Sequence, residues 1–201
     1  MIARADRRRI GLLGGSFNPA HDGHLHVSRL AVQRLRLDQV WWLVSPQNPL
    51  KSADEIAPLE ARMVAARRVA AAERRIVVTD LEAGHGTRYT ADTLAALKKR
   101  APQARLVWLM GADNLIQLPE WKRWTTIMDS VPVAVFGRPT YALRALAGKA
   151  AQRYAPYRLP PEAAPGLADR IPPAWIFIVG PQHAGSATAI RAAMRHKDER
   201  N

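Results

Sequence analysis

Six short runs of apolar and β-branched residues recur along this chain of 201 residues, and segments with helical spacing separate most of them. Runs such as VWWLV and WIFIV are apolar at nearly every position, which is typical of parallel strands covered on both faces. Strands that alternate with helices indicate parallel crossover connections. The pattern therefore predicts an α/β fold, a Rossmann-like doubly wound and mostly parallel sheet of about six strands with helices on both faces. The predicted strands are 9–13, 40–44, 75–79, 106–110, 131–136 and 175–179.

Helices and one proline-rich segment complete the expected organisation, a single domain over 1–201. Apolar residues repeat at helical spacing after Gly23, and a second helix is expected near Pro58, whose missing N–H suits a first turn. A third helix is expected at 91–100. The segment 154–173 carries six prolines and cannot be a continuous helix or a central strand. We interpret it as a surface excursion within the domain.

The charge of the chain indicates an anionic ligand. Thirty lysines and arginines against 17 acidic residues give a formal net charge of +13, which favours nucleotides or nucleic acid. Nucleic-acid binding stays open as an alternative, but no helix-turn-helix, zinc or RNA-binding signature supports it. The absence of cysteine excludes disulfides and thiolate metal sites and fits the cytoplasm. No leader pattern and no apolar run near the ~18 residues of a membrane span is present, so no membrane association is expected.

The stretch GLLGGSFNPAHDGH, which follows the first predicted strand, carries the clearest sign of chemistry. Gly14 and Gly15 let backbone N–H groups approach a phosphate closely, and the next helix adds a favourable dipole. The stretch is neither a Walker loop nor a G-x-G-x-x-G fingerprint. His21 and His24, three residues apart at a helix start, can point into a common space and donate hydrogen bonds to phosphate oxygens.

Two other interpretations of these histidines remain. Both residues could be ordinary polar surface residues. They could also bind a metal together with Asp22 and His26, but neighbouring side chains at a helix start diverge, and no further cluster completes a coordination shell. We therefore predict no protein-held metal.

Motifs far apart in the chain resemble those of one enzyme family. GGSFNPAHDGH resembles the G-x-F-x-P-x-H-x-G-H signature of the nucleotidyltransferase α/β superfamily, and SATAIR, near the C-terminus, resembles its S-x-T-x-I-R motif. The stretches RYTADTL, GADNLIQLPEWKRWTTI and FGRP are similar to the bacterial nicotinate-nucleotide adenylyltransferases. Leu50 stands where many members have His, and Gly185 where Ile is common.

The resemblance implies an adenylyltransferase that makes nicotinate adenine dinucleotide and pyrophosphate from nicotinate mononucleotide and ATP. It implies His21 and His24 as catalytic phosphate contacts, with Mg²⁺ bound mainly through the ATP phosphates. The implied ATP-binding residues are Gly14, Gly15, Ser16, Phe17, Gly111, Asp113, Ser186, Thr188 and Arg191. The implied mononucleotide-binding residues are Asn18, Lys51, Thr90, Trp121 and Lys122.

Several of these residues also have structural interpretations. Asp113, Ser186 and Thr188 could be helix caps, and Trp121 could be a core residue, which is how we interpret Trp124. Phosphopantetheine adenylyltransferase shares the first motif but lacks a stretch like LPEWKRW. The sequence leaves open the preference between nicotinate and nicotinamide mononucleotide, and the oligomeric state.

Overall fold

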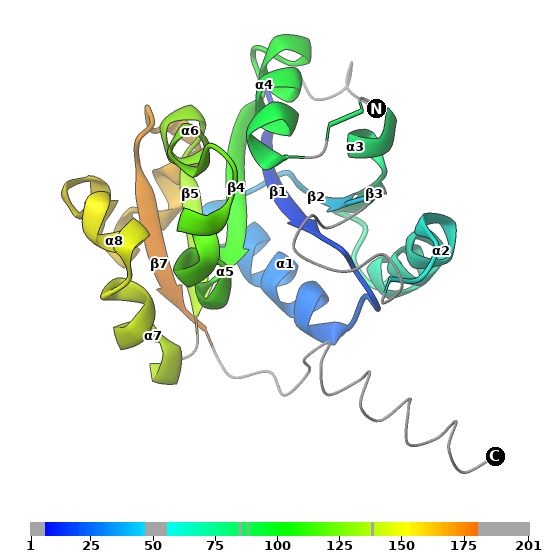
Figure 1. Ribbon diagram of the computed structural model, residues 1–201, viewed down its shortest axis with the longest axis horizontal. Helices are drawn as coiled ribbons and strands as arrows, with labels where there is room; N and C mark the ends of the chain where they lie inside the picture. Colours follow the sequence, from blue (N-terminus) through cyan, green and yellow to red (C-terminus); the bar gives the residue numbers. More distant parts are fainter. Residues whose placement is uncertain (1–6, 47–55, 85, 88, 138, 181–201) are drawn as a thin grey trace.

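A parallel sheet of seven strands forms the centre of the protein (Figure 1). The computed structural model describes residues 7–46, 56–84, 86–87, 89–137 and 139–180. The strand order is β3-β2-β1-β4-β5-β7-β6, and every neighbouring pair is parallel. The strands are β1 (Arg9–Gly15), β2 (Gln39–Val44), β3 (Ile76–Thr79), β4 (Arg105–Gly111), β5 (Val133–Gly137), β6 (Arg158–Leu159) and β7 (Trp175–Val179). The predicted doubly wound α/β fold is therefore confirmed.

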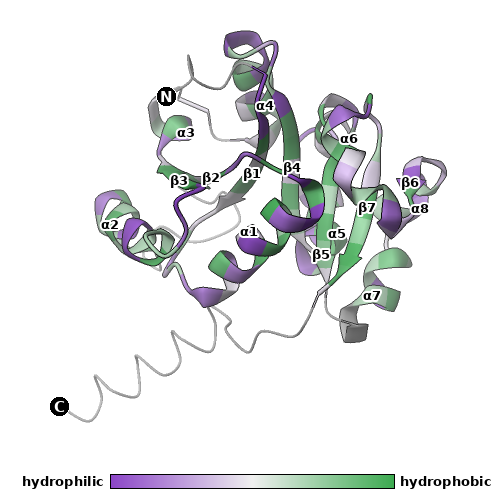
Figure 2. Ribbon diagram, turned by 180° about the vertical axis from the view of Figure 1, so that it is seen from behind, coloured by the Kyte–Doolittle hydropathy of each residue, from purple (hydrophilic) through white to green (hydrophobic). Residues whose placement is uncertain are grey.

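Helices cover both faces of the sheet, and alternate residues of each strand point to opposite faces. In β4, Leu106 and Trp108 belong to one core cluster while Val107 and Leu109 belong to the other. The α-helices are α1 (Asp22–Leu35), α2 (Leu59–Ala70), α3 (Leu81–Gly84), α4 (Thr90–Arg100), α5 (Ala112–Gln117), α6 (Trp124–Ser130), α7 (Pro139–Leu146) and α8 (Lys149–Arg153). Figure 2 shows the apolar strands β4 and β7 between helices whose residues alternate between polar and apolar.

The two faces have different coverings. The first cluster receives buried residues from α4 to α8, among them Leu94 and Leu97 of α4. The second receives Leu25, Val32 and Leu35 of α1 together with residues of α2. Short 3₁₀ helices connect these elements, namely η3 (Leu118–Glu120), η4 (Ala155–Tyr157) and η5 (Pro161–Asp169). Among the described residues, no helix is both long and apolar enough to cross a membrane.

The proline-rich segment differs from the surface excursion that the sequence suggested. It contains β6, the strand that raises the number from about six to seven, and η5, whose Leu167 is fully buried in the second core cluster. Asp169 at the end of η5 forms ion pairs with Arg9 of β1, at 2.6 Å, and with Arg105 of β4. Proline stops an α-helix but tolerates 3₁₀ turns, so this segment covers the sheet without one.

Candidate active site

The predicted phosphate-binding residues lie at the carboxyl ends of two neighbouring strands. Gly14 and Gly15 end β1, and Gly111 ends β4. These two strands pair in the middle of the sheet, and the order β3-β2-β1-β4-β5 changes direction between them (Figure 1). In open α/β sheets, ligands bind at this kind of switch point. Residues nearly 100 positions apart in the chain therefore share one crevice edge.

The loop after β1 is held by one buried aromatic side chain. Phe17 has a positive φ of 46°, uncommon for a residue with a side chain, and its ring is 1% exposed. The ring stacks on Trp42 with centroids 5.0 Å apart and lies 4.7 Å from the ring of His24. Packing of Phe17 therefore fixes the loop next to the histidines. Phe17 therefore contributes a buried anchor for this loop.

His21 and His24 cap the first turn of α1 for each other. The N–H of Gly23 donates to Nδ1 of His21 at 3.1 Å, and the N–H of His21 donates to Nδ1 of His24 at 3.2 Å. This is the geometry of a capping box, with histidines in place of the usual hydroxyl and carboxylate. Because both Nδ1 atoms accept, each neutral ring carries its proton on Nε2. The two imidazole rings lie close together at the start of α1, with centroids 4.0 Å apart.

The His24 ring is neutral near pH 7. Its pKa is lowered from 6.5 to about 3, mainly by burial and also by the nearby His21, while the backbone hydrogen bond from His21 partly opposes the shift. A neutral imidazole stabilises an anion through one directed hydrogen bond. It brings no positive charge, so the charge of a bound anion would have to be neutralised by other groups.

Gly111 and Asp113 form the opposite edge of the crevice. Asp113 lies exposed in the first turn of α5, and its Oδ1 folds back over Gly111 so closely that a methyl group there would collide with it. Gly111 is therefore required for the position of this carboxylate. No side-chain cap is made at the start of α5, which does not support the interpretation of Asp113 as an N-cap.

The structure also brings together the two segments predicted to bind the mononucleotide. Thr90 begins α4, and the ammonium of Lys122 lies 4.5 Å from the centroid of the ring of Tyr89. An ion pair between Arg123 and Asp92 adds a second contact between the same segments. The start of α4 and the loop 121–123 thus form one surface.

The two tryptophans of this region differ in their surroundings. Trp124 lies edge-on to Tyr154 with centroids 5.8 Å apart, and the guanidinium of Arg153 lies over the Trp124 ring, 5.7 Å from its centroid. Trp121 is half-buried against the first core cluster and, within the described part of the chain, pairs with no other ring. This arrangement leaves Trp121 available for stacking on a ligand and gives Trp124 a packing role.

Two buried charged side chains escaped the sequence analysis. Glu82 is 7% exposed and accepts a hydrogen bond from Thr93 Oγ1 at 3.1 Å, and burial raises its pKa to about 7. Arg62 is 3% exposed and donates to four main-chain carbonyls. The only local signal for Arg62 was its position four residues before the apolar Ala66 on the same helix face.

Four predicted site residues, Lys51, Ser186, Thr188 and Arg191, lie outside the described residues. Among the described ones, Asn18 accepts a weak 3.4 Å hydrogen bond from the N–H of Ala57. No group of three or more His, Cys, Asp or Glu side chains with the geometry of a metal site occurs among them either.

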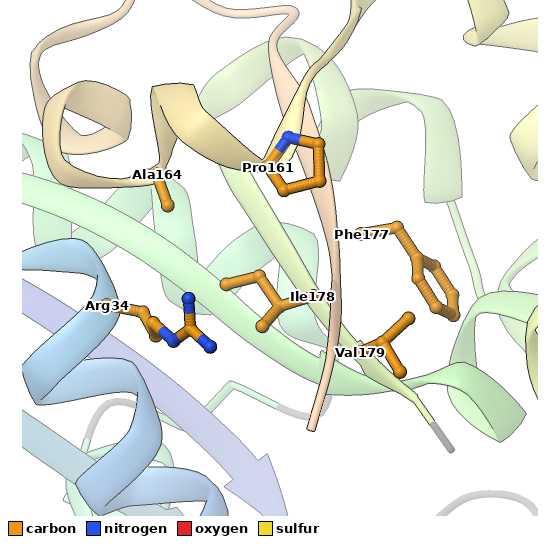
Figure 3. Close-up of a pocket in the computed structure, with 6 residues that line it drawn as sticks. All are labelled: Arg34, Pro161, Ala164, Phe177, Ile178 and Val179. Carbon is orange, nitrogen blue, oxygen red and sulfur yellow. The ribbon is translucent and has the colours of Figure 1, made fainter. Parts of the chain in front are cut away.

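A separate cavity of about 180 Å³ lies away from this crevice (Figure 3). Its lining comes from α1, η5 and β7, with Arg34 and Ile178 facing each other across it. Arg34 is ten residues beyond His24 in α1, which corresponds to about 15 Å along a helix axis. The cavity is therefore distinct from the histidine site.

The chain is similar in sequence to known proteins over most of its length. Residues 12–193 match the cytidylyltransferase-like family. A Methylorubrum extorquens protein named "Probable nicotinate-nucleotide adenylyltransferase" is 55% identical over 91% of this chain and 98% of its own length. A protein of the same name from Parvibaculum lavamentivorans is 54% identical over 91% of this chain and 90% of its own length.

The fold is shared with a solved structure of much lower sequence similarity. Nicotinic acid mononucleotide adenylyltransferase of Plasmodium falciparum, complexed with NaAD, superimposes with a TM-score of 0.68 at 16% identity. The match covers 92% of this chain and 83% of the Plasmodium chain. At this identity the likeness concerns the fold alone.

Proposed function

The chain belongs to the cytidylyltransferase-like family and, within it, to the nicotinate-nucleotide adenylyltransferases, and we propose that it transfers the AMP moiety of ATP to nicotinate mononucleotide. The products are nicotinate adenine dinucleotide and pyrophosphate, a step of NAD biosynthesis. The observation that carries the proposal is the pair of mutually capped histidines at the start of α1, which follows the glycine-ended strand β1 at the switch point of the sheet.

The reaction needs positioning more than acid–base chemistry. The 5′-phosphate of the mononucleotide is anionic at neutral pH, so one of its oxygens attacks the α-phosphorus of ATP without a general base. The new P–O bond forms as the bond between the α-phosphorus and the bridging oxygen breaks, and pyrophosphate leaves. Negative charge grows on the α-phosphate oxygens, where Nε2–H donors from His21 and His24 stabilise the transition state.

The substrate is the Mg²⁺ complex of ATP. Mg²⁺ keeps several waters and binds readily through phosphate oxygens. In this proposal the ion arrives with the triphosphate and is held mainly by its oxygens and by water. The metal supplies charge neutralisation when bound.

The remaining residues have proposed binding roles. Asp113 accepts from the ribose hydroxyls of ATP above Gly111, since its carboxylate is exposed at the crevice edge. The surface formed by the start of α4 and residues 121–123 binds the pyridine ring, with Trp121 stacked on it and main-chain N–H groups near Thr90 and Lys122 donating to the carboxylate.

Pyrophosphate release tests the activity. The purified protein is incubated with ATP and Mg²⁺ and with one of nicotinate mononucleotide, nicotinamide mononucleotide or phosphopantetheine. We expect release with nicotinate mononucleotide above the other two. Release only with phosphopantetheine, or with none of them, would refute the proposal.

Two substitutions separate the catalytic role of His24 from its capping role. In His24→Asn, Oδ1 can replace Nδ1 of His24 as the acceptor of the cap, but the donor at Nε2 is lost. In His24→Gln, the side-chain amide places an N–H donor near the position of Nε2. We expect His24→Asn to keep the fold and to lower kcat by about 10²- to 10³-fold, the loss seen when a single transition-state donor is removed. His24→Gln should recover part of that loss. Equal activities of the two variants would contradict the proposed role.

A further inference from the structure

Arg62 occupies an unusual environment for an arginine. It lies on the buried face of α2, and four of its five N–H donors meet main-chain carbonyls. Nε donates to Ala57 at 2.7 Å, Nη1 to Ser16 at 2.7 Å and to Ser45 at 2.8 Å, and Nη2 to Pro46 at 3.0 Å. Side chains of this kind are seldom fully buried without a carboxylate partner.

The four carbonyls belong to three segments that meet at the carboxyl edge of the sheet. Ser16 lies in the loop after β1, Ser45 and Pro46 follow β2, and Ala57 precedes α2. Among the described residues, the first two segments are otherwise joined beyond the strand pairing by one main-chain hydrogen bond, from the N–H of Ser45 to the carbonyl of Gly15 at 3.0 Å. The guanidinium is therefore the main link among these segments within the described part of the chain.

The bond to Ser16 also sets the direction of a backbone donor. In a planar trans peptide, the carbonyl and the following N–H point in opposite directions. Because the Ser16 carbonyl points at Arg62, the N–H of Phe17 points away from it, and Phe17 has the uncommon φ of 46°. Within the described residues, this N–H makes no intramolecular hydrogen bond. The bond to Arg62 thus fixes the orientation of this peptide group at the end of β1.

The charge of Arg62 adds an electrostatic effect. Burial lowers its pKa, and no acidic side chain among the described residues contributes an opposing shift. The group stays cationic because an arginine pKa is far above neutral. A positive charge with no carboxylate partner among the described residues thus lies beneath the loop that follows β1, where His24 itself is neutral.

We propose that Arg62 is a positioning residue for nucleotidyl transfer: its guanidinium fixes the loop 14–18 and the end of β2 in the arrangement that receives the phosphate groups. This inference rests on the proposed function for the identity of the reaction. Arg62 itself touches no reacting atom. It acts through the main chain of Ser16 and Phe17.

The deciding variant is Arg62→Lys, which keeps the charge and the aliphatic stem but cannot form the planar fork. Arg62→Met removes the charge as well. Arg67 is exposed on the same helix, so Arg67→Lys and Arg67→Met are matched controls. For each protein we would measure kcat, the KM values for ATP and mononucleotide, ATP binding by calorimetry, and the melting temperature.

Because misplacement of a reacting group by about 1 Å can cost ~10²-fold in rate, we expect Arg62→Lys to lower kcat by about 10- to 100-fold at a temperature where it is fully folded. ATP binding should weaken in Arg62→Lys, the KM for the mononucleotide should change by less than about threefold, and both Arg67 variants should match the wild-type protein.

Wild-type kcat in Arg62→Lys with only a lower melting temperature would overturn the inference, and so would a protein that fails to fold, because either result assigns Arg62 to the fold. Failure of the proposed function would appear separately, as a wild-type protein that releases no pyrophosphate. ATP affinity would then decide on Arg62, since a loss in Arg62→Lys but not in Arg67→Lys still supports a role at the phosphate loop.

Discussion

β1 ends in two adjacent glycines that we expect to be needed for different reasons. Gly14 lies against the core, whereas Gly15 leaves space for the substrate. A Cβ at Gly14 would lie 2.6 Å from Cη2 and 3.1 Å from Cζ2 of Trp108, a core residue that is 2% exposed. A Cβ at Gly15 would meet only the ring of Phe17, at an ordinary 3.5 Å. Gly15 is also not among the described residues with positive φ. The two alanine substitutions should therefore have opposite effects.

These contacts give the direction of each effect on stability, and the usual energies of such substitutions give its magnitude. Overpacking of a well-packed core costs about 1–3 kcal/mol, so Gly14→Ala should lower the melting temperature by about 2–12 °C at the ~2–4 °C per kcal/mol typical of this size. Replacement of Gly by Ala at a compatible backbone position stabilises by about 0.4–1 kcal/mol, because the unfolded chain loses freedom. Gly15→Ala should therefore raise the melting temperature by about 1–4 °C.

Activity should follow the reverse order. If a phosphate approaches the backbone at Gly15, the added methyl group occupies its path, and kcat/KM for ATP should fall by about tenfold or more, equivalent to at least ~1.4 kcal/mol. Thermal unfolding and pyrophosphate release, measured on the same preparations, test both parts. Wild-type kcat/KM for ATP in Gly15→Ala would refute the close approach of phosphate, and an unchanged melting temperature in Gly14→Ala would refute the packing argument.

Three further predictions concern single side chains. The pKa of His24, about 3, is depressed below its unfolded value of 6.5, so its contribution to stability is present above pH 6.5 and is lost as the pH falls towards 3. The free energy of unfolding, measured with urea, should thus fall by up to ~1.4 kcal/mol more per pH unit in the wild-type protein than in His24→Asn as the pH is lowered from about 6 to 4.5. Parallel pH profiles of the two proteins would contradict this. The pKa of Glu82 is instead raised to about 7, so the stability from its neutral form is present below about pH 4.5 and is lost as the pH rises through 7. Glu82→Gln should raise the melting temperature at pH 8 but not at pH 4.5, whereas the exposed control Glu60→Gln should raise it at neither pH. Finally, Trp121→Ala should raise KM for the mononucleotide by about 5- to 150-fold, the equivalent of the ~1–3 kcal/mol of a stacked base, and Trp124→Ala should mainly lower the melting temperature; the reverse result would exchange their roles.

The sequence by itself determined the elements and the residue types of the site. Local hydrophobic periodicity is enough to define a strand such as Trp175–Val179, whose predicted ends agree with the structure, and the helix α1 that begins between His21 and His24. The short spacing of His21 and His24 likewise fixes their proximity, because both lie in one helical turn. These features depend on neighbours in the chain, which a single sequence displays directly.

Only the tertiary structure decided the order of the strands, the covering of the sheet and the environment of each charge. Strand β6 has two residues, too few to form a pattern, and is a strand only because β7 lies beside it. The burial that shifts the pKa of His24 to about 3, and that surrounds Arg62 with carbonyls from three segments, depends on residues brought together by the sheet. Desolvation and hydrogen bonding act through space, so a residue's electrostatic state cannot be read from its neighbours in the sequence.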